Sequence, residues 1–139
     1  MTFEARLADC LPPGALLTSD EAKRPYECDA LSAYHAMPRV VVVPETRAEV
    51  AAVVRLCAEY GVPLVTRGAG TGLSGGALPL VDGCLLSLAR FNRILAIDTA
   101  NRTATVEPGV RNLAISEAVA PYGLYYAPDP SSQIACTIG

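Results

Sequence analysis

The sequence has no tryptophan, one histidine among 139 residues and few aromatic side chains of any kind. It contains neither a CxxC pair nor an HExxH motif, so the common ligand sets for zinc are missing. Its net charge of −3 argues against nucleic-acid binding, which normally needs a basic surface. We therefore expect no metal site and no nucleic-acid partner.

Long apolar runs are also missing, although 51% of the residues are hydrophobic. The run of valines at residues 40–43 has the length of a strand and is far shorter than the roughly 18–20 residues of a membrane helix. Residues 1–9 carry two acids and lack the apolar segment of a signal peptide. The five cysteines are odd in number and widely spaced, which is typical of reduced thiols. We expect a cytoplasmic protein with a single folded core.

The pattern of residues 40–66 predicts a strand, a helix and a second strand. Four consecutive valines at 40–43 indicate a strand buried on both faces. Thr46 and Glu49 match a capping box, and the apolar spacing behind them predicts a helix over residues 46–60. Residues 62–66 form the second short apolar run. We expect the two strands to be parallel neighbours, with the helix on one face.

The rest of the chain predicts short elements separated by turns, which makes the fold class α+β, a small mixed sheet with flanking helices. Asn112 is expected to cap a short helix that runs to Ala120. Glu107 is expected on a solvated face. The expected strands are residues 84–88, a hairpin of 94–98 with 103–107, and a strand-like stretch at 124–127.

Five glycines fall within residues 68–76, directly after the second strand. Such a loop lets backbone N–H groups turn toward a ligand and lets the ligand approach closely. A diphosphate suits this arrangement because it offers several acceptor oxygens. Arg67 can add a cation, and Thr71 and Ser74 can add hydroxyl donors.

Three other interpretations of this loop fit less well. Residues 70–75 satisfy GxGxxG, but the loop leads to Pro79 and a strand instead of opening a helix, and position 90 is an arginine instead of an acid. A Walker A loop requires Lys-Ser/Thr after its last glycine, where this chain has Gly76-Ala77. A purely structural turn would use five glycines at a cost in conformational entropy.

The loop and its flanking stretches resemble one flavoprotein family. The sequence RGAGTGLSGG at residues 67–76 resembles the first FAD-binding loop of the PCMH-type, or vanillyl-alcohol-oxidase-type, fold. Residues 26–34, 65–79, 106–115 and 125–139 are similar to the FAD-linked D subunits of bacterial glycolate oxidases. That group also includes D-lactate and D-2-hydroxyglutarate dehydrogenases.

The resemblance implies an FAD site made of two parts. It divides the chain into a lead-in (residues 1–38, irregular or helical), a first FAD-binding α+β subdomain (39–127) and the start of a second (128–139). Threonine at position 71, where covalent members often have histidine, implies non-covalent FAD. The implied cofactor-binding residues are Arg67, Gly68, Ala69, Gly70, Thr71, Gly72, Leu73, Ser74, Gly75, Pro108, Gly109, Pro128, Ser131, Thr137 and Gly139.

The resemblance also implies a reaction, the oxidation of a 2-hydroxy acid such as glycolate with hydride transfer to flavin. In the family the catalytic groups and a histidine–glutamate metal cluster belong to a C-terminal substrate domain, so we assign no catalytic residue to residues 1–139 and expect them to be inactive alone. Other glycolate oxidase subunits, one of them an iron–sulfur subunit, are the implied partners, with the complex peripheral to the inner membrane. Two alternatives stay open: a nucleotide-binding module and an interaction fragment, both without activity.

Overall fold

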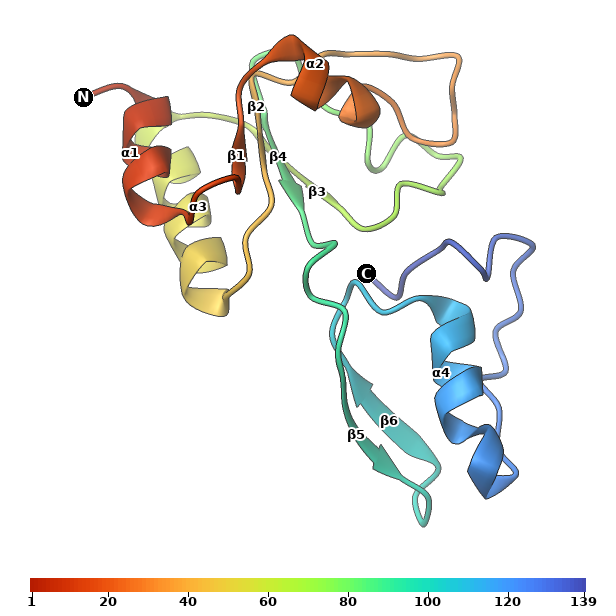
Figure 1. Cartoon of the computed structure of the whole chain (residues 1–139). Helices are drawn as coiled ribbons and strands as arrows, with labels where there is room; N and C mark the ends of the chain where they lie inside the picture. The colour runs from red at the N-terminus through yellow and green to blue at the C-terminus, as the bar shows by residue number, and fades with distance from the viewer.

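The structure is a computed structural model that describes all 139 residues as two sheets with four α-helices (Figure 1). The strands are β1 (Leu16–Leu17), β2 (Val40–Val42), β3 (Leu64–Arg67), β4 (Cys84–Ser87), β5 (Ile94–Asp98) and β6 (Thr103–Val106). The helices are α1 (Phe3–Cys10), α2 (Asp20–Lys23), α3 (Arg47–Tyr60) and α4 (Asn112–Val119), with 3₁₀ turns at Arg24–Tyr26 and Ala120–Tyr122. None of these helices has the length and apolar character needed to cross a bilayer. The expected α+β class with a small mixed sheet is confirmed.

Strand β2 is buried on both faces of the four-stranded sheet, which explains the run of four valines. Val40 and Val42 face a cluster of twelve buried residues between the sheet, α1 and α3. Val41 and Val43 face the opposite side and pack with Leu85. Because successive side chains of a strand alternate between faces, a strand covered on both sides needs apolar residues at every position.

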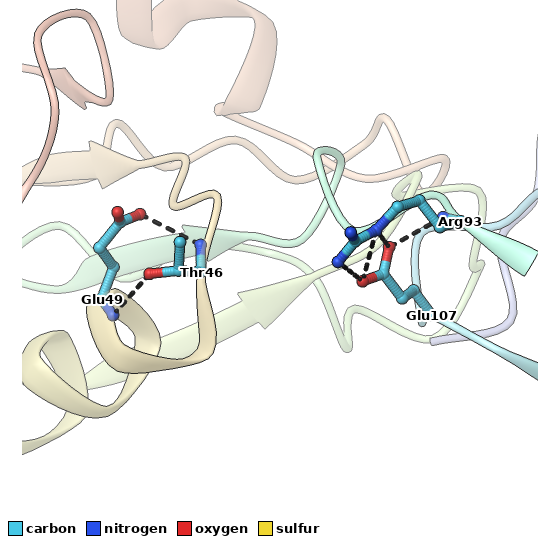
Figure 2. Close-up of polar contacts among 4 residues, drawn as sticks. All are labelled: Thr46, Glu49, Arg93 and Glu107. Carbon is cyan, nitrogen blue, oxygen red and sulfur yellow. Dashed lines mark hydrogen bonds and ion pairs between the residues drawn. The ribbon is translucent and has the colours of Figure 1, made fainter. Parts of the chain in front are cut away.

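Helix α3 begins and ends where the sequence predicts. The Thr46 hydroxyl accepts a hydrogen bond from the Glu49 backbone N–H at 3.2 Å, and the Glu49 carboxylate accepts one from the Thr46 N–H at 3.2 Å. Figure 2 shows this reciprocal capping box. Gly61 ends the helix in a left-handed conformation with φ +64°, which costs glycine little. Thr46 itself is the N-cap, so the helix proper starts at Arg47.

The expected order of the strands is wrong in one respect. Strands β2 and β3 are parallel but are not neighbours, because β4 lies between them and pairs in parallel with each. All four residues of β4 are buried, as the central position of the strand requires. Strand β1 adds an antiparallel edge next to β2.

The first 38 residues are more regular than their composition indicates. Helix α1 packs beside α3, and its Phe3 and Leu7 are almost completely buried in the main core (Figure 1). The lead-in therefore covers one face of the four-stranded sheet.

The β5–β6 hairpin is confirmed, with a register shift between Ile94 and Ala96. Two expectations near it are wrong. Asn112 is the first residue of α4 instead of its cap, because its side chain is buried and its backbone N–H donates to the Cys136 carbonyl at 2.9 Å. Residues 124–127 form no strand, because they run beside α4 without a strand partner.

Candidate functional site

The glycine loop leaves the end of β3 and lies against the last residues of the chain. Together they line a hollow of about 290 Å³. Its wall includes residues 68–72 from the glycine loop, and Thr137 and Gly139 from the C-terminal loop. The structure thus brings together two segments that are almost 70 residues apart in sequence.

Thr137 joins the two loops through its hydroxyl group. Its Oγ1 accepts a hydrogen bond from the Ala69 backbone N–H at 3.0 Å and donates one to the Gly139 carbonyl at 3.0 Å. The close approach requires glycine at position 68, because a Cβ atom there would lie 1.9 Å from the Gly139 oxygen. A side chain at this position would push the loops apart.

The Arg67 guanidinium fixes the glycine loop to the preceding part of the chain. Its Nη1 donates to the Cys28 carbonyl at 2.5 Å, and its Cζ lies 5.6 Å from the centre of the Tyr26 ring. Gly70, with φ +73°, lies directly over this group, since a Cβ atom on it would be 2.4 Å from the Arg67 Cζ. Arg67 forms no ion pair, and it supports the loop from the side occupied by residues 26–28.

The turn at Pro108 and Gly109 connects the C-terminal loop to the segment that follows β4. The Pro108 carbonyl accepts a hydrogen bond from the Gly139 N–H at 2.7 Å, and the Gly109 N–H donates to the Phe91 carbonyl at 2.7 Å. Gly109 leaves no room for a side chain, because a Cβ atom would lie 2.5 Å from the Leu88 carbonyl oxygen.

Glu107 holds this turn through an ion pair with Arg93, in which the glutamate side chain is buried and the arginine side chain is exposed. This corrects the expected solvated position of Glu107. Its carboxylate accepts hydrogen bonds from the Arg93 backbone N–H at 2.8 Å and from the Arg93 Nη2 at 2.7 Å (Figure 2). These hydrogen bonds from Arg93 lower the pKa of Glu107 below its ordinary value. The carboxylate is therefore charged at neutral pH and holds the start of the turn against Arg93, the residue before β5.

The C-terminal loop also covers the first turn of α4. The N–H groups of Asn112 and Leu113 donate to the carbonyls of Cys136 and Gln133, at 2.9 and 3.1 Å. Helix α4 has no side-chain cap, so these backbone carbonyls satisfy its free N–H groups. Arg111 pairs with Thr137 in an isolated antiparallel bridge.

A second hollow, of about 430 Å³, adjoins the first at the contact between Ala69 and Thr137. It shares Gly68, Ala69 and Thr137 with the first hollow, and Arg111 and Asn92 also line it. No aspartate or glutamate side chain lines either hollow. Small residues, hydroxyl groups and backbone atoms dominate the wall of the first hollow, so its residues fit a phosphorylated ligand. Half of the residues that line the second hollow are apolar, and Arg111 is the cation among the rest.

The structure gathers some of the candidate residues and separates others. Seven of them line the first hollow: Gly68, Ala69, Gly70, Thr71, Gly72, Thr137 and Gly139. Pro108 and Gly109 adjoin these residues, as described above. Leu73 and Ser74 are exposed on the outer part of the loop beside Gly75, and Pro128 and Ser131 are exposed and line neither hollow.

Three polar wall residues were not among the candidates from the sequence: Thr66, near the end of β3, Asn92 and Arg111. Asn92 lies in the connection between β4 and β5, which carries no motif. Arg111 follows Gly109 by two residues inside the stretch 106–115. That proximity is the only signal that could have identified it. No group of three or more His, Cys, Asp or Glu side chains is placed to hold a metal ion.

Comparison with known proteins gives consistent results. Residues 38–139 match the model of the FAD binding domain family. The chain is 59% identical over 133 residues to glycolate oxidase subunit GlcD of Escherichia coli, covering 96% of this chain and 27% of that protein. It is 36% identical over 130 residues to D-lactate dehydrogenase of Anaerostipes hadrus, covering 93% of this chain and 27% of that protein.

The fold matches solved structures of larger proteins. A crystal structure of alkyldihydroxyacetonephosphate synthase superimposes with a TM-score of 0.86 over 99% of this chain and 28% of that chain, at 21% identity. The chain thus spans about a quarter of the length of the curated relatives it matches.

Proposed function

The chain belongs to the FAD binding domain family, and from that premise we propose that its glycine loop and C-terminal loop together hold the diphosphate of FAD. The observation that supports this most is the shared hollow. Its wall combines the backbone of residues 68–72 with Thr137 and Gly139, and it contains no aspartate or glutamate side chain that would repel phosphate. Arg67 contributes by fixing the loop, as its contacts with Cys28 and Tyr26 indicate.

The remaining assignments of the site belong to the same proposal. The Pro108 carbonyl accepts a hydrogen bond from Gly139, so the turn at Pro108 and Gly109 holds the C-terminal loop in place beside the glycine loop. Residues 128–139, with Pro128 and Ser131, begin a second cofactor-binding part that follows the subdomain of residues 39–127 and the lead-in of residues 1–38.

FAD is held without a covalent bond in this proposal. Thr71 lies on the wall of the hollow, and its hydroxyl can donate a hydrogen bond to a phosphate but does not form the stable flavin linkage of a histidine. Denaturing the FAD-loaded protein should release all of its flavin into the supernatant. Flavin that remains on the precipitated chain would contradict this assignment.

The wider activity proposed for a protein with this chain is the oxidation of a 2-hydroxy acid to a 2-oxo acid. Similarity to a glycolate oxidase subunit and to a D-lactate dehydrogenase supports this class of substrate. FAD would supply the acceptor for the two electrons lost by the substrate. The base that removes the hydroxyl proton is not assigned to residues 1–139. Association with further subunits, as the name of the GlcD relative indicates for that protein, is part of the same proposal.

A binding module without activity is the second candidate. The lack of any cluster of titratable groups at the hollows favours it for residues 1–139 considered alone. Residues 1–139 alone should leave FAD unreduced under both candidates, so the test uses the whole protein that carries this chain. Anaerobic reduction of its FAD by glycolate or D-lactate would support the oxidoreductase, and FAD that neither acid reduces would support the module.

Titration of the purified chain with FAD, followed by flavin fluorescence, tests whether the glycine loop and the C-terminal loop bind the cofactor. Gly70→Val should abolish tight binding, because its Cβ would lie on the Arg67 guanidinium. Gly14→Val is a matched control, since Gly14 has a similar φ of +81° but meets no atom within 4 Å. Equal FAD affinity in the Gly70 variant and the control would refute the assignment of the loop.

A further inference from the structure

We propose that Arg111 supplies the positive charge that holds the phosphates of FAD, from the second hollow, while Arg67 serves to position the loop. This inference rests on the proposed function and adds a residue to it. Arg111 is the only cationic side chain on the wall of either hollow beside the glycine loop.

The backbone directs the Arg111 side chain to the same face as the Thr137 hydroxyl. Arg111 and Thr137 are directly opposite each other in an antiparallel bridge, so their side chains leave the backbone on the same face. The Thr137 hydroxyl on that face reaches the Ala69 N–H at 3.0 Å. The Arg111 side chain therefore starts beside the contact that joins the two loops.

The charge of Arg111 is free for a ligand. No carboxylate pairs with it, whereas Arg6, Arg39, Arg90 and Arg93 all form ion pairs. One hydrogen bond, from Nη1 to the Ile134 carbonyl at 3.3 Å, holds the side chain in place. A guanidinium has five N–H donors, so most of them remain available to phosphate oxygens.

The charge of Arg67, by contrast, is directed away from the hollow. Its guanidinium lies between the Tyr26 ring and Gly70 and donates to the Cys28 carbonyl, and Arg67 is not part of either wall. Substitution of Arg67 should therefore loosen the loop, but the phosphate charge should be balanced mainly by Arg111.

Two variants separate the charge of Arg111 from its hydrogen bond. Arg111→Gln keeps a donor for the Ile134 carbonyl but removes the charge, and Arg111→Lys keeps the charge. Arg55→Gln is the control, because Arg55 is an exposed, unpaired arginine on α3 that lines neither hollow. The dissociation constant of FAD would be measured for each variant at low and high NaCl, together with its Tm.

The FAD dissociation constant of Arg111→Gln should rise about tenfold at low salt, as expected for one partly exposed charge-assisted contact. The difference should shrink in about 0.5 M NaCl, which screens exposed charges beyond a few ångströms. Arg111→Lys should retain most of the affinity, and Arg55→Gln all of it.

Two outcomes would overturn the role of Arg111. One is wild-type affinity in Arg111→Gln; the other is a loss that does not change with salt, which would indicate packing instead of charge. A wild-type chain that fails to bind FAD at all would instead refute the proposed function, so the two failures can be distinguished.

Discussion

Replacing Gly68 with alanine tests whether the two loops must touch in order to bind FAD. The added Cβ would lie 1.9 Å from the Gly139 carbonyl oxygen and 2.4 Å from the Thr137 hydroxyl. Ordinary contact begins near 3.4 Å, so the C-terminal loop must move away by about 1.5 Å. A displacement of that size lengthens the 3.0 Å hydrogen bond between Ala69 and Thr137 beyond hydrogen-bonding range.

The loss in FAD affinity can be estimated from these contacts. Two hydrogen bonds, from Ala69 to Thr137 and from Gly139 to Pro108, depend on the placement of the C-terminal loop. At about 0.5–1.5 kcal/mol each, their loss corresponds to about 1–3 kcal/mol. The dissociation constant of FAD should therefore rise by about 5- to 150-fold.

The assay is FAD titration by fluorescence, with thermal unfolding of the same samples as a check on folding. Gly76→Ala is the comparison variant, because Gly76 also lines the hollow but a Cβ there meets no atom within 4 Å. It leaves the contact between the two loops intact and should lose much less affinity. The two lost hydrogen bonds also belong to the chain without ligand, so its Tm should fall by several degrees. Unfolding should stay cooperative, because the main core does not involve Gly68. Unchanged FAD affinity in Gly68→Ala would refute the account of the loop contact.

Three further predictions concern stability. Thr46→Ala removes the hydroxyl of the capping box and should lower the free energy of unfolding by about 1 kcal/mol in urea titrations, and an unchanged midpoint would contradict the role of the cap. The pKa of Glu107 is lowered in the folded chain, so its stabilising ion pair is present at neutral pH and should be lost as the pH falls below 4.5. Glu107→Gln should weaken this pH dependence, which is measured as Tm against pH. Leu7→Ala should cost about 2–5 kcal/mol, since Leu7 is fully buried, and a negligible effect in the same titrations would show that α1 is not part of the core.

The sequence predicts the elements that depend on local signals. Helix α3 was found because its capping box, apolar spacing and final glycine are all encoded within 16 residues. The hairpin was found because alternation in residues 103–106 shows one exposed face. Helix α1 was missed, since its two core residues span only two turns and its stability depends on packing against α3.

Features that depend on contacts between distant segments cannot be predicted from the local sequence. Nothing in the apolar run of β4 indicates that it inserts between β2 and β3, because that order depends on pairing across the whole sheet. Alternation placed Glu107 in solvent, but the chain turns immediately after it and directs the carboxylate to Arg93. For the site, glycine spacing predicted the first loop, and only the resemblance to a family indicated that Thr137 would lie against it.

Amide hydrogen exchange of the full chain, with and without FAD, tests the central claim most directly. If both loops hold the cofactor, FAD should slow exchange in peptides that cover residues 68–72 and in those that cover residues 137–139. Peptides from α1 and α3, which pack away from both hollows, should be unaffected. Bound FAD that protects only one loop, or only the apolar groove beside α4 lined by Tyr125 and Leu124, would contradict the claim.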